Sequence, residues 1–200
     1  MLIINGTVHT MDGLTIPGGY VAIRGDKIAQ VGPMEECPKD WEGRIFDARH
    51  ITPGFIDAHC HLGMFGDGVG IEGDDGNEAT DPCTPHLRAV DAVNPLDRCF
   101  QEAREAGVTT VLTGPGSANP ISGQFAALKT NGKWVDAMVL KAPAAMKMAL
   151  GENPKLTYNE RHETPSTRMA TAAVIRENLA KAVEYREKLE RAAQDEDEDK

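Results

Sequence analysis

The sequence has little that would favour a membrane-spanning segment or a leader, and we expect neither. No apolar run approaches the ~18 residues that a transmembrane helix needs. Met1 leads directly into Leu2–Gly6, without the basic region and apolar core of a signal peptide. No C-x-x-C pair and no disulfide framework occurs among its cysteines, which are Cys37, Cys60, Cys83 and Cys99. We therefore expect a soluble, cytoplasmic protein in a reducing compartment.

Basic residues are scarce. Lys and Arg number 21 against 31 Asp and Glu, which gives a formal net charge of −10. An acidic chain repels a phosphate backbone, so we do not expect nucleic acid as a partner. The lack of a long apolar run argues against a membrane, and the partner that we expect is a small-molecule substrate. Part of the acidic charge forms a run at 195–199, and residues 194–200 are predicted to be a disordered tail. The hydrophobic share of 40% is ordinary for a globular protein.

Short strands are predicted throughout residues 1–50. Apolar runs flank Asn5-Gly6, a strong hairpin signal, and a second pair of runs flanks Gly25-Asp26. A last short strand is expected at 44–48. The lone histidines His9 and His50 are expected to be ordinary surface side chains. So few residues would bury little apolar area alone, so we expect a small sheet, or one half of a β-sandwich, that packs on the following domain or is completed by strands from elsewhere.

The segment Pro53–Gly63, read P-G-F-I-D-A-H-C-H-L-G, carries the strongest chemical signal. Side chains alternate along a strand, so His59 and His61 are predicted to lie on one face, with Ile56 and Ala58 on a buried opposite face. Two imidazoles on one face can converge on a metal ion such as zinc. Asp57, on the same face as the histidines, can orient a ligand.

A parallel crossover is predicted after this strand. The segment 63–85 is rich in glycine and acidic residues but matches neither a calcium loop nor a phosphate loop, so we expect a flexible loop near the site. A helix is predicted from its cap Asn94 to Gly107, and a buried strand over Val108–Thr113. In a parallel pair, the residues after Gly114 would lie at the same end as the histidines.

The residues after 114 offer further candidates. Substrate polar groups could be held by four side chains of a predicted loop, namely Ser117, Asn119, Ser122 and Gln124. Short strands are predicted at 137–140 and 146–150. Glu152, just past the second of them, could join the metal, whereas Lys147 could point inward and, carboxylated on its amine, bridge two metals; the residues leave both options open. A long helix is predicted over 169–193.

These segments together resemble the amidohydrolase superfamily of metal-dependent hydrolases, close to its imidazolonepropionase-like members. The resemblance is carried by L-I-I-N-G-T-V, G-D-K-I-A-Q-V-G, T-P-G-F-I-D-A-H-C-H-L-G and A-G-V-T-T-V-L-T-G-P-G, which lie between residue 1 and about residue 116. It implies an α/β fold, a TIM-type (β/α)8 barrel with a small β-sandwich. It also implies one or two divalent metal ions, usually Zn2+, and an activated water that hydrolyses a cyclic amide or related C–N bond. His59 and His61 match the ligands on the family's first strand, and Glu152 would match a carboxylate ligand of some members.

The resemblance also predicts that the barrel is incomplete in this chain. After Glu152 the only histidine is His162, whereas the family adds histidines and an aspartate from later strands. A full barrel takes roughly 250 residues, so residues 51–193 would form its first half. Completion would come from a missing C-terminal half or from a homo-oligomer. The alternative function is a truncated, non-catalytic remnant or partner subunit of such an enzyme.

Overall fold

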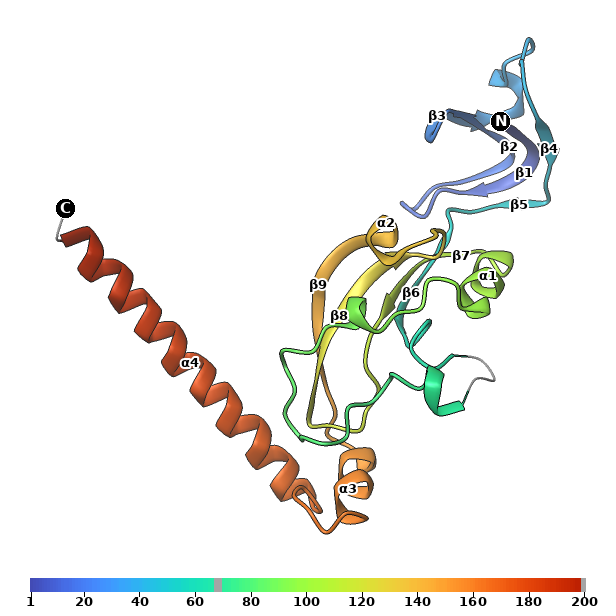
Figure 1. Ribbon diagram of the computed structural model, residues 1–200. Coiled ribbons are helices and arrows are strands. Elements are labelled where there is room, and N and C mark those ends of the chain that lie inside the picture. Colours follow the sequence, from blue (N-terminus) through green and yellow to red (C-terminus); the bar gives the residue numbers. More distant parts are fainter. Residues whose placement is uncertain (67–69, 199–200) are drawn as a thin grey trace. The chain divides into compact units, whose positions relative to one another are not determined.

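Five short strands build the N-terminal part of the computed structural model, which describes residues 1–66 and 70–198. They are β1 (Leu2–His9), β2 (Thr15–Arg24), β3 (Lys27–Pro33), β4 (Ile45–Asp47) and β5 (His50–Ile51). They form one sheet in the order β3-β2-β1-β4, with β5 also paired to β1 (Figure 1). A short 3-10 helix, η1 (Met34–Glu36), follows β3.

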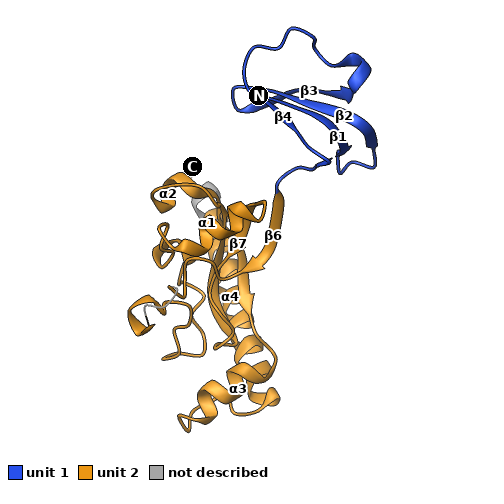
Figure 2. Ribbon diagram, turned by 90° about the vertical axis from the view of Figure 1, so that its right-hand side faces the viewer, with its two compact units in different colours: residues 1–54 blue, residues 55–200 orange. Residues whose placement is uncertain are grey.

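The chain divides into two compact units, Met1–Gly54 and Phe55–Lys200 (Figure 2). The five-stranded sheet makes up most of the first unit. The boundary lies beyond residue 50 because β5 pairs with β1 and so belongs to the first sheet.

The expected hairpin at Asn5-Gly6 is wrong. β1 runs through both residues as one strand, and its pairing with β2 shifts register on either side of Gly6. Asn5 has a φ of 65°, in the left-handed region that asparagine tolerates. A Cβ on Gly6 would lie 2.8 Å from the carbonyl oxygen of Ala48, so the neighbouring chain approaches too closely for a side chain. The dipeptide therefore makes a bulge inside a strand instead of a turn between two.

The second turn is where the sequence places it. Arg24 pairs with Lys27 across Gly25-Asp26, and Gly25 has a φ of 60°. The β2–β3 hairpin is thus confirmed. Alternation along β1 and β2 separates two small apolar clusters, one around Leu2, Tyr20 and Ala22, the other around Val8, Val21 and Ile51.

The second unit contains a four-stranded sheet. Its strands are β6 (Phe55–Cys60), β7 (Val108–Thr113), β8 (Ile121–Lys129) and β9 (Val139–Met148), side by side in that order (Figure 1). β6 and β7 are parallel and joined through α1 (Arg98–Glu105), which confirms the predicted crossover. The pairs β7–β8 and β8–β9 are antiparallel. The fold is therefore mixed α/β, and within the described residues the sheet remains open.

Strand β8 is absent from the sequence prediction, which treated Ser122 and Gln124 as loop residues. Both residues bond to a neighbouring segment: Gln124 Nε2 donates to the carbonyl of Pro85 at 3.1 Å, and the backbone carbonyl of Ser122 accepts from the hydroxyl of Thr84 at 3.1 Å. Isolated bridges link Cys83 with Ile121 and Arg88 with Gln124. The polar pattern of this strand reflects these contacts, not exposure to water. Likewise, the two strands expected at 137–140 and 146–150 are one strand, β9, preceded by α2 (Val135–Met138).

The core of the second unit lies where α1 and the loop after β6 pack on the sheet. Its buried members are Met64, Ala89, Val93, Phe100, Val111, Ala126, Leu128 and Met138. Helix α1 begins at Asp97, not at the predicted Asn94: Asp97 is 9% exposed, and its carboxylate accepts from the backbone N–H of Cys99 at 3.0 Å. Gly107, with a φ of 86°, ends the helix as expected.

The long loop between β6 and α1 is held at several points. It contains the 3-10 helices η2 (Gly70–Gly73) and η3 (Ala89–Asp91). The N–H of Asp75 donates to the carbonyl of Met64 at 2.9 Å, and the N–H of Gly116 donates to the carbonyl of Gly76 at 2.7 Å. Residues 67–69 of the predicted loop lie outside the described residues.

The expectation that strand β6 is buried is wrong. β6 is at the edge of its sheet, and Phe55 is 56% and Ile56 is 68% exposed.

The tail that was expected to be disordered from residue 194 is helical as far as the structure describes it. Helix α4 (Arg168–Glu198) contains the predicted helix and follows a shorter helix, α3 (Glu152–Asn159). Residues 199–200 lie outside the described part.

None of the helices in the described part of the chain is long and apolar enough to span a membrane.

Candidate metal centre

The two histidines of the P-G-F-I-D-A-H-C-H-L-G segment lie together. His59 is on β6 and His61 follows its last residue, so strand alternation puts both rings on one face. Their ring centroids are 5.2 Å apart in an edge-to-face arrangement. The neighbouring strand β7 ends at Thr113, which places Gly114 beside them.

Gly114 fixes which nitrogen of His61 carries a hydrogen. The Nδ1 of His61 lies 2.7 Å from the carbonyl oxygen of Gly114. A carbonyl can only accept, so Nδ1 is the donor and the other nitrogen, Nε2, keeps its lone pair in the neutral ring. A histidine oriented by a backbone carbonyl is the usual arrangement of a metal ligand.

The ring of Phe125, on β8, contacts both histidine rings. The ring of His59 stacks on that of Phe125 with centroids 5.7 Å apart and an interplanar angle of 13°. His61 meets the same ring edge-on at 6.3 Å. Phe125 is only 4% exposed, so both imidazoles rest on a buried side chain. Phe125 was not identified as part of the site from the sequence, because its strand was not recognised.

Lys147, on β9, is the third side chain at the site that carries a nitrogen atom able to bind a metal when it is neutral. Its Nζ lies 3.1 Å from Nε2 of His59 and 5.8 Å from the centroid of Phe125. An ammonium group can only donate, so Nε2 of His59 accepts and the hydrogen of the neutral ring is on Nδ1. Burial lowers the pKa of the Lys147 amine below its ordinary value.

Glu152 lies near Lys147 but does not complete a cluster of classical ligands. It is the exposed first residue of α3, and it lines a pocket of about 280 Å³ together with Lys147 and Ser117. Among the described residues, no group of three or more His, Cys, Asp and Glu is placed to hold a metal ion. The structure therefore brings His59, His61 and Lys147 together, and the role of Glu152 as a ligand stays a prediction.

Most of the other polar residues singled out in the sequence have structural partners. The carboxylate of Asp57 accepts a hydrogen bond from the backbone N–H of His59 at 3.1 Å, within the same strand β6. Asn119 is 1% exposed; its amide donates to the carbonyl of Glu78 at 2.6 Å, and its Oδ1 accepts from the hydroxyl of Tyr158 at 2.6 Å. Ser122 Oγ donates to the carbonyl of Asn119 at 3.1 Å. Of the four loop candidates, Ser117 alone lines the pocket beside Lys147.

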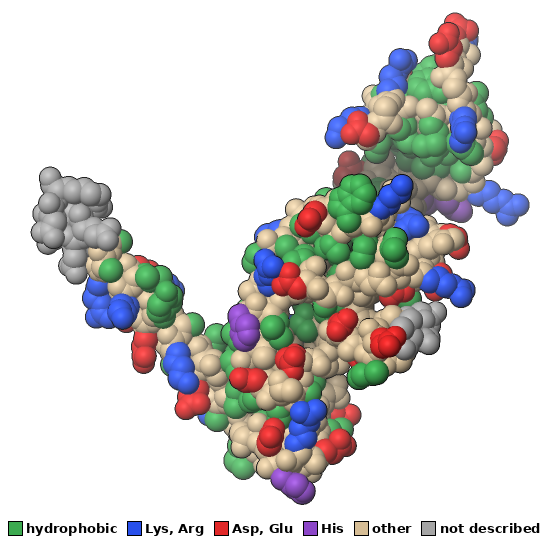
Figure 3. Space-filling model, viewed as in Figure 1, with side chains coloured by type: hydrophobic (Ala, Val, Ile, Leu, Met, Phe, Trp, Pro, Cys, Tyr) green, Lys and Arg blue, Asp and Glu red, His purple; other side chains and the backbone are tan. Residues whose placement is uncertain are grey.

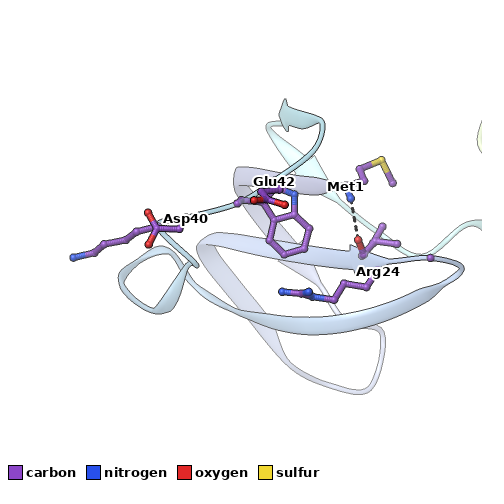
Figure 4. A pocket seen from close by; sticks show the side chains of 8 residues that line it. Met1, Arg24, Asp40 and Glu42 are labelled. Carbon is purple, nitrogen blue, oxygen red and sulfur yellow. Dashed lines mark hydrogen bonds between the residues drawn. The ribbon is translucent and has the colours of Figure 1, made fainter.

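A larger pocket of about 750 Å³ lies in the N-terminal unit, between Arg24 and the 39–42 segment (Figure 4). The guanidinium of Arg24 lies 5.2 Å from the centroid of Trp41. The N-terminal ammonium of Met1 donates to the carbonyl of Ile23 at 2.9 Å. Nε1 of Trp41 is buried and has no hydrogen-bond partner among the described residues. The lining offers charges of both signs but no grouped nucleophile, and no residue of the histidine site.

Comparison with known proteins finds relatives for most of the chain, although no family model matches the sequence. The chain is 35% identical over 182 residues to the amidohydrolase tasK of Hapsidospora irregularis, which covers 84% of this chain and 17% of that protein. It is 46% identical over 54 residues to the imidazolonepropionase of Yersinia pestis (strain Pestoides F), 26% of this chain and 13% of that enzyme.

A crystal structure agrees with these matches over nearly the whole chain. An amidohydrolase from Thermotoga maritima MSB8 superposes with a TM-score of 0.85 at 44% identity, covering 94% of this chain and 49% of that one. The chain thus spans about half of this solved relative, and a smaller share of the two curated relatives. Both sequence and fold place it with the same group, and the chain belongs to the amidohydrolase superfamily, to whose N-terminal portion it corresponds.

Proposed function

We propose that this chain forms the metal-binding part of a hydrolase that cleaves a cyclic amide or related C–N bond. The names of its relatives support hydrolysis of C–N bonds at the family level. The observation that carries the proposal is the grouping of three nitrogen-bearing side chains around the buried ring of Phe125, namely His59, His61 and Lys147. When bound, a divalent ion such as zinc supplies Lewis acidity and lowers the pKa of a coordinated water.

The two imidazoles suit such an ion. Nε2 of His61 has a free lone pair because Nδ1 donates to Gly114. Nε2 of His59 already accepts from a cationic group, the ammonium of Lys147 at 3.1 Å. The lone pair that accepts a hydrogen bond from this ammonium is the one that a neutral imidazole would donate to a metal ion. His59 and His61 are therefore assigned as ligands.

For the third ligand we favour Lys147 over Glu152. Lys147 reaches His59 directly, whereas Glu152 is exposed at the start of α3. A lysine amine in its neutral form can add carbon dioxide and lose a proton, which gives a carbamate whose single negative charge is shared by two oxygen atoms. That reaction would turn the cation beside His59 into a ligand that can hold one or two divalent ions.

We further propose that the parallel β6-α1-β7 unit begins a (β/α)8 barrel. The support is the superposition on the amidohydrolase of Thermotoga maritima, of which this chain covers 49%. In such barrels the active site lies at the carboxyl ends of the strands, which is where His61 and Gly114 are. Substrate specificity would then depend on the loops that follow the strands.

Metal analysis of the purified full chain tests the ligand assignment. We expect stoichiometric zinc by elemental analysis after loading and dialysis, lost in His59→Ala and retained in His86→Ala, a substitution of another exposed histidine. Lys147→Met and Glu152→Gln separate the two candidates for the third ligand, because only replacement of the true ligand would release zinc. Equal zinc content in all four variants would contradict the assignment.

A non-catalytic remnant or partner subunit is the second candidate. It is favoured by the lack, in the described part of the chain, of a three-membered group of classical ligands. Metal analysis separates the two candidates, because neither requires this part of the enzyme to hydrolyse substrate alone. Stoichiometric zinc that is lost in His59→Ala supports the hydrolase part, whereas no bound zinc supports the remnant.

A further inference from the structure

A second pair of histidines, His9 and His50, lies in the N-terminal unit. Strands β1 and β5 are parallel, with Thr7 opposite His50. Because side chains alternate along a strand, His9 lies on the same face as Thr7, one step further along β1. The register therefore places His9 diagonally beside His50. In the structure, Nε2 of His9 lies 3.2 Å from Nδ1 of His50.

The two rings meet edge to edge. Their centroids are 5.4 Å apart and their planes are inclined by 23°. At this nitrogen–nitrogen distance one ring donates N–H and the other accepts with its lone pair. The pair is at the surface, with His50 exposed and His9 half-buried. The backbone beneath it is fixed, since the N–H of Thr7 donates to the carbonyl of Arg49 at 2.9 Å.

The separation of the two nitrogen atoms matches that of a chelate. Two zinc–nitrogen bonds of about 2.0–2.1 Å at a tetrahedral angle put the nitrogen atoms roughly 3.3 Å apart. We propose that His9 and His50 form a surface site for a divalent transition-metal ion of the zinc class, with water molecules as the remaining ligands. The proposal is independent of the function proposed above, because these residues are in the other unit.

Binding requires small changes at the surface only. The hydrogen shared between the facing nitrogen atoms moves to the far nitrogen of its own ring, so two neutral imidazoles bind the ion without releasing a proton. The rings then rotate about χ2 until both lone pairs point at the ion. Imidazole ligands favour Cu2+, Ni2+ and Zn2+ over Mg2+ and Ca2+. With two protein ligands, the site should bind more weakly than a centre with three.

The bound ion would also stabilise the pairing of β5 with β1. β5 has only two residues, and the chain continues from it towards Gly54, the last residue of the unit. An ion that binds the folded pair and not the unfolded chain stabilises the folded state in proportion to its concentration. The site would thus make the stability of the N-terminal unit depend on the metal supply.

Calorimetric titration with zinc chloride tests the site in the full chain carrying His59→Ala and His61→Ala, which removes the other imidazoles proposed to bind metal. We expect one zinc equivalent, with affinity reduced by about tenfold or more when either His9→Gln or His50→Gln is added, since one ligand is lost. His86→Gln, at another exposed histidine, should leave the affinity unchanged. Magnesium chloride should give no binding.

Nuclear magnetic resonance of the unsubstituted chain gives an answer that does not depend on how the variants fold. Zinc should shift the imidazole nitrogen resonances of His9 and His50 together, with one saturation curve. Unshifted resonances for this pair, or unchanged zinc affinity in both glutamine variants, would overturn the proposal.

Discussion

Gly114 determines how closely β7 approaches the candidate metal centre. Its carbonyl orients His61, and its lack of a side chain leaves room for Phe125. A Cβ at this position would lie 2.1 Å from Cδ2 of Phe125, which is buried and cannot move aside freely. The same ring supports His59 and His61, so strain at Gly114 reaches both imidazoles.

We therefore expect Gly114→Ala to lower the free energy of unfolding by about 1–3 kcal/mol, the usual cost of overpacking, and to weaken zinc binding. Urea denaturation and zinc titration measure the two effects. Gly151→Ala is the matched control, because a Cβ at Gly151 would meet no atom within 4 Å. Equal unfolding free energies for the two variants would show that the ring of Phe125 can shift to accommodate the new Cβ without loss of stability.

Tyr158 connects α3 to the buried amide of Asn119. Its hydroxyl donates to Asn119 Oδ1 at 2.6 Å, and both residues are at most 1% exposed. Tyr158→Phe would leave that oxygen buried without a donor, so we expect a loss of about 1–3 kcal/mol in unfolding free energy. Tyr185→Phe, at a residue that is 64% exposed, should change it little. Chemical denaturation of both variants measures the difference.

The same tyrosine predicts a dependence of stability on alkaline pH. Burial is the main cause that raises the pKa of Tyr158 from 10.0 to about 12. The folded state therefore holds the phenolic proton more tightly than the unfolded state. This stabilisation is fully present below pH 10 and is lost as pH rises towards 12. Across that range we expect unfolding free energy to fall more steeply in the wild type than in Tyr158→Phe; parallel curves would refute the assignment.

At the scale of elements, the sequence was most informative where local signals act alone. The β2–β3 hairpin, α1 and β7 follow from turn residues and apolar periodicity. Strand β8 was missed because it packs beside the distant segment 82–88, to which Gln124 bonds, and no local pattern reveals that contact. The bulge at Asn5-Gly6 was predicted to be a turn for a similar reason. The bulge depends on the close approach of the distant residue Ala48 to Gly6, which no local pattern reveals.

Helix α1 offers a test of its observed start. Asp97 accepts from the N–H of Cys99 from a buried position, whereas the exposed Asn94 accepts from the N–H of Leu96 outside the helix. Loss of a helix cap costs about 0.5–2 kcal/mol. We expect Asp97→Ala to be the more destabilising change in urea denaturation, with Asn94→Ala as the matched control. The reverse order would mean that the helix begins at Asn94 in solution.

At the scale of the whole molecule, the sequence indicated that His59 and His61 lie together but not which side chains surround them. His59 and His61 were found because strand alternation is a local rule. Phe125 and Lys147 join them only through the pairing of β7, β8 and β9, which depends on contacts between distant segments. The sequence left Lys147 and Glu152 as alternatives, since the direction of a side chain near a strand end depends on the register of the neighbouring strand.

The second unit exposes apolar side chains at both edges of its sheet. Ile56 on β6 is 68% exposed and Leu140 on β9 is 53% exposed, and hydrophobic side chains reach the visible surface among charged ones (Figure 3). An exposed apolar edge strand is prone to pair with another chain. We therefore expect the isolated chain to associate with further copies at micromolar concentrations, as sedimentation velocity would detect by a sedimentation coefficient that rises with concentration.

A charge on the edge should suppress this association. Ile56→Lys places an ammonium group on β6, the means by which natural edge strands avoid pairing. We expect its sedimentation coefficient to stay near the monomer value at concentrations where the wild type associates. Ile71→Lys is the control, because Ile71 is 87% exposed but lies in η2, away from a strand edge. If both lysine variants disperse the assembly equally, net charge and not the β6 edge governs association; if neither does, the contact lies elsewhere on the molecule.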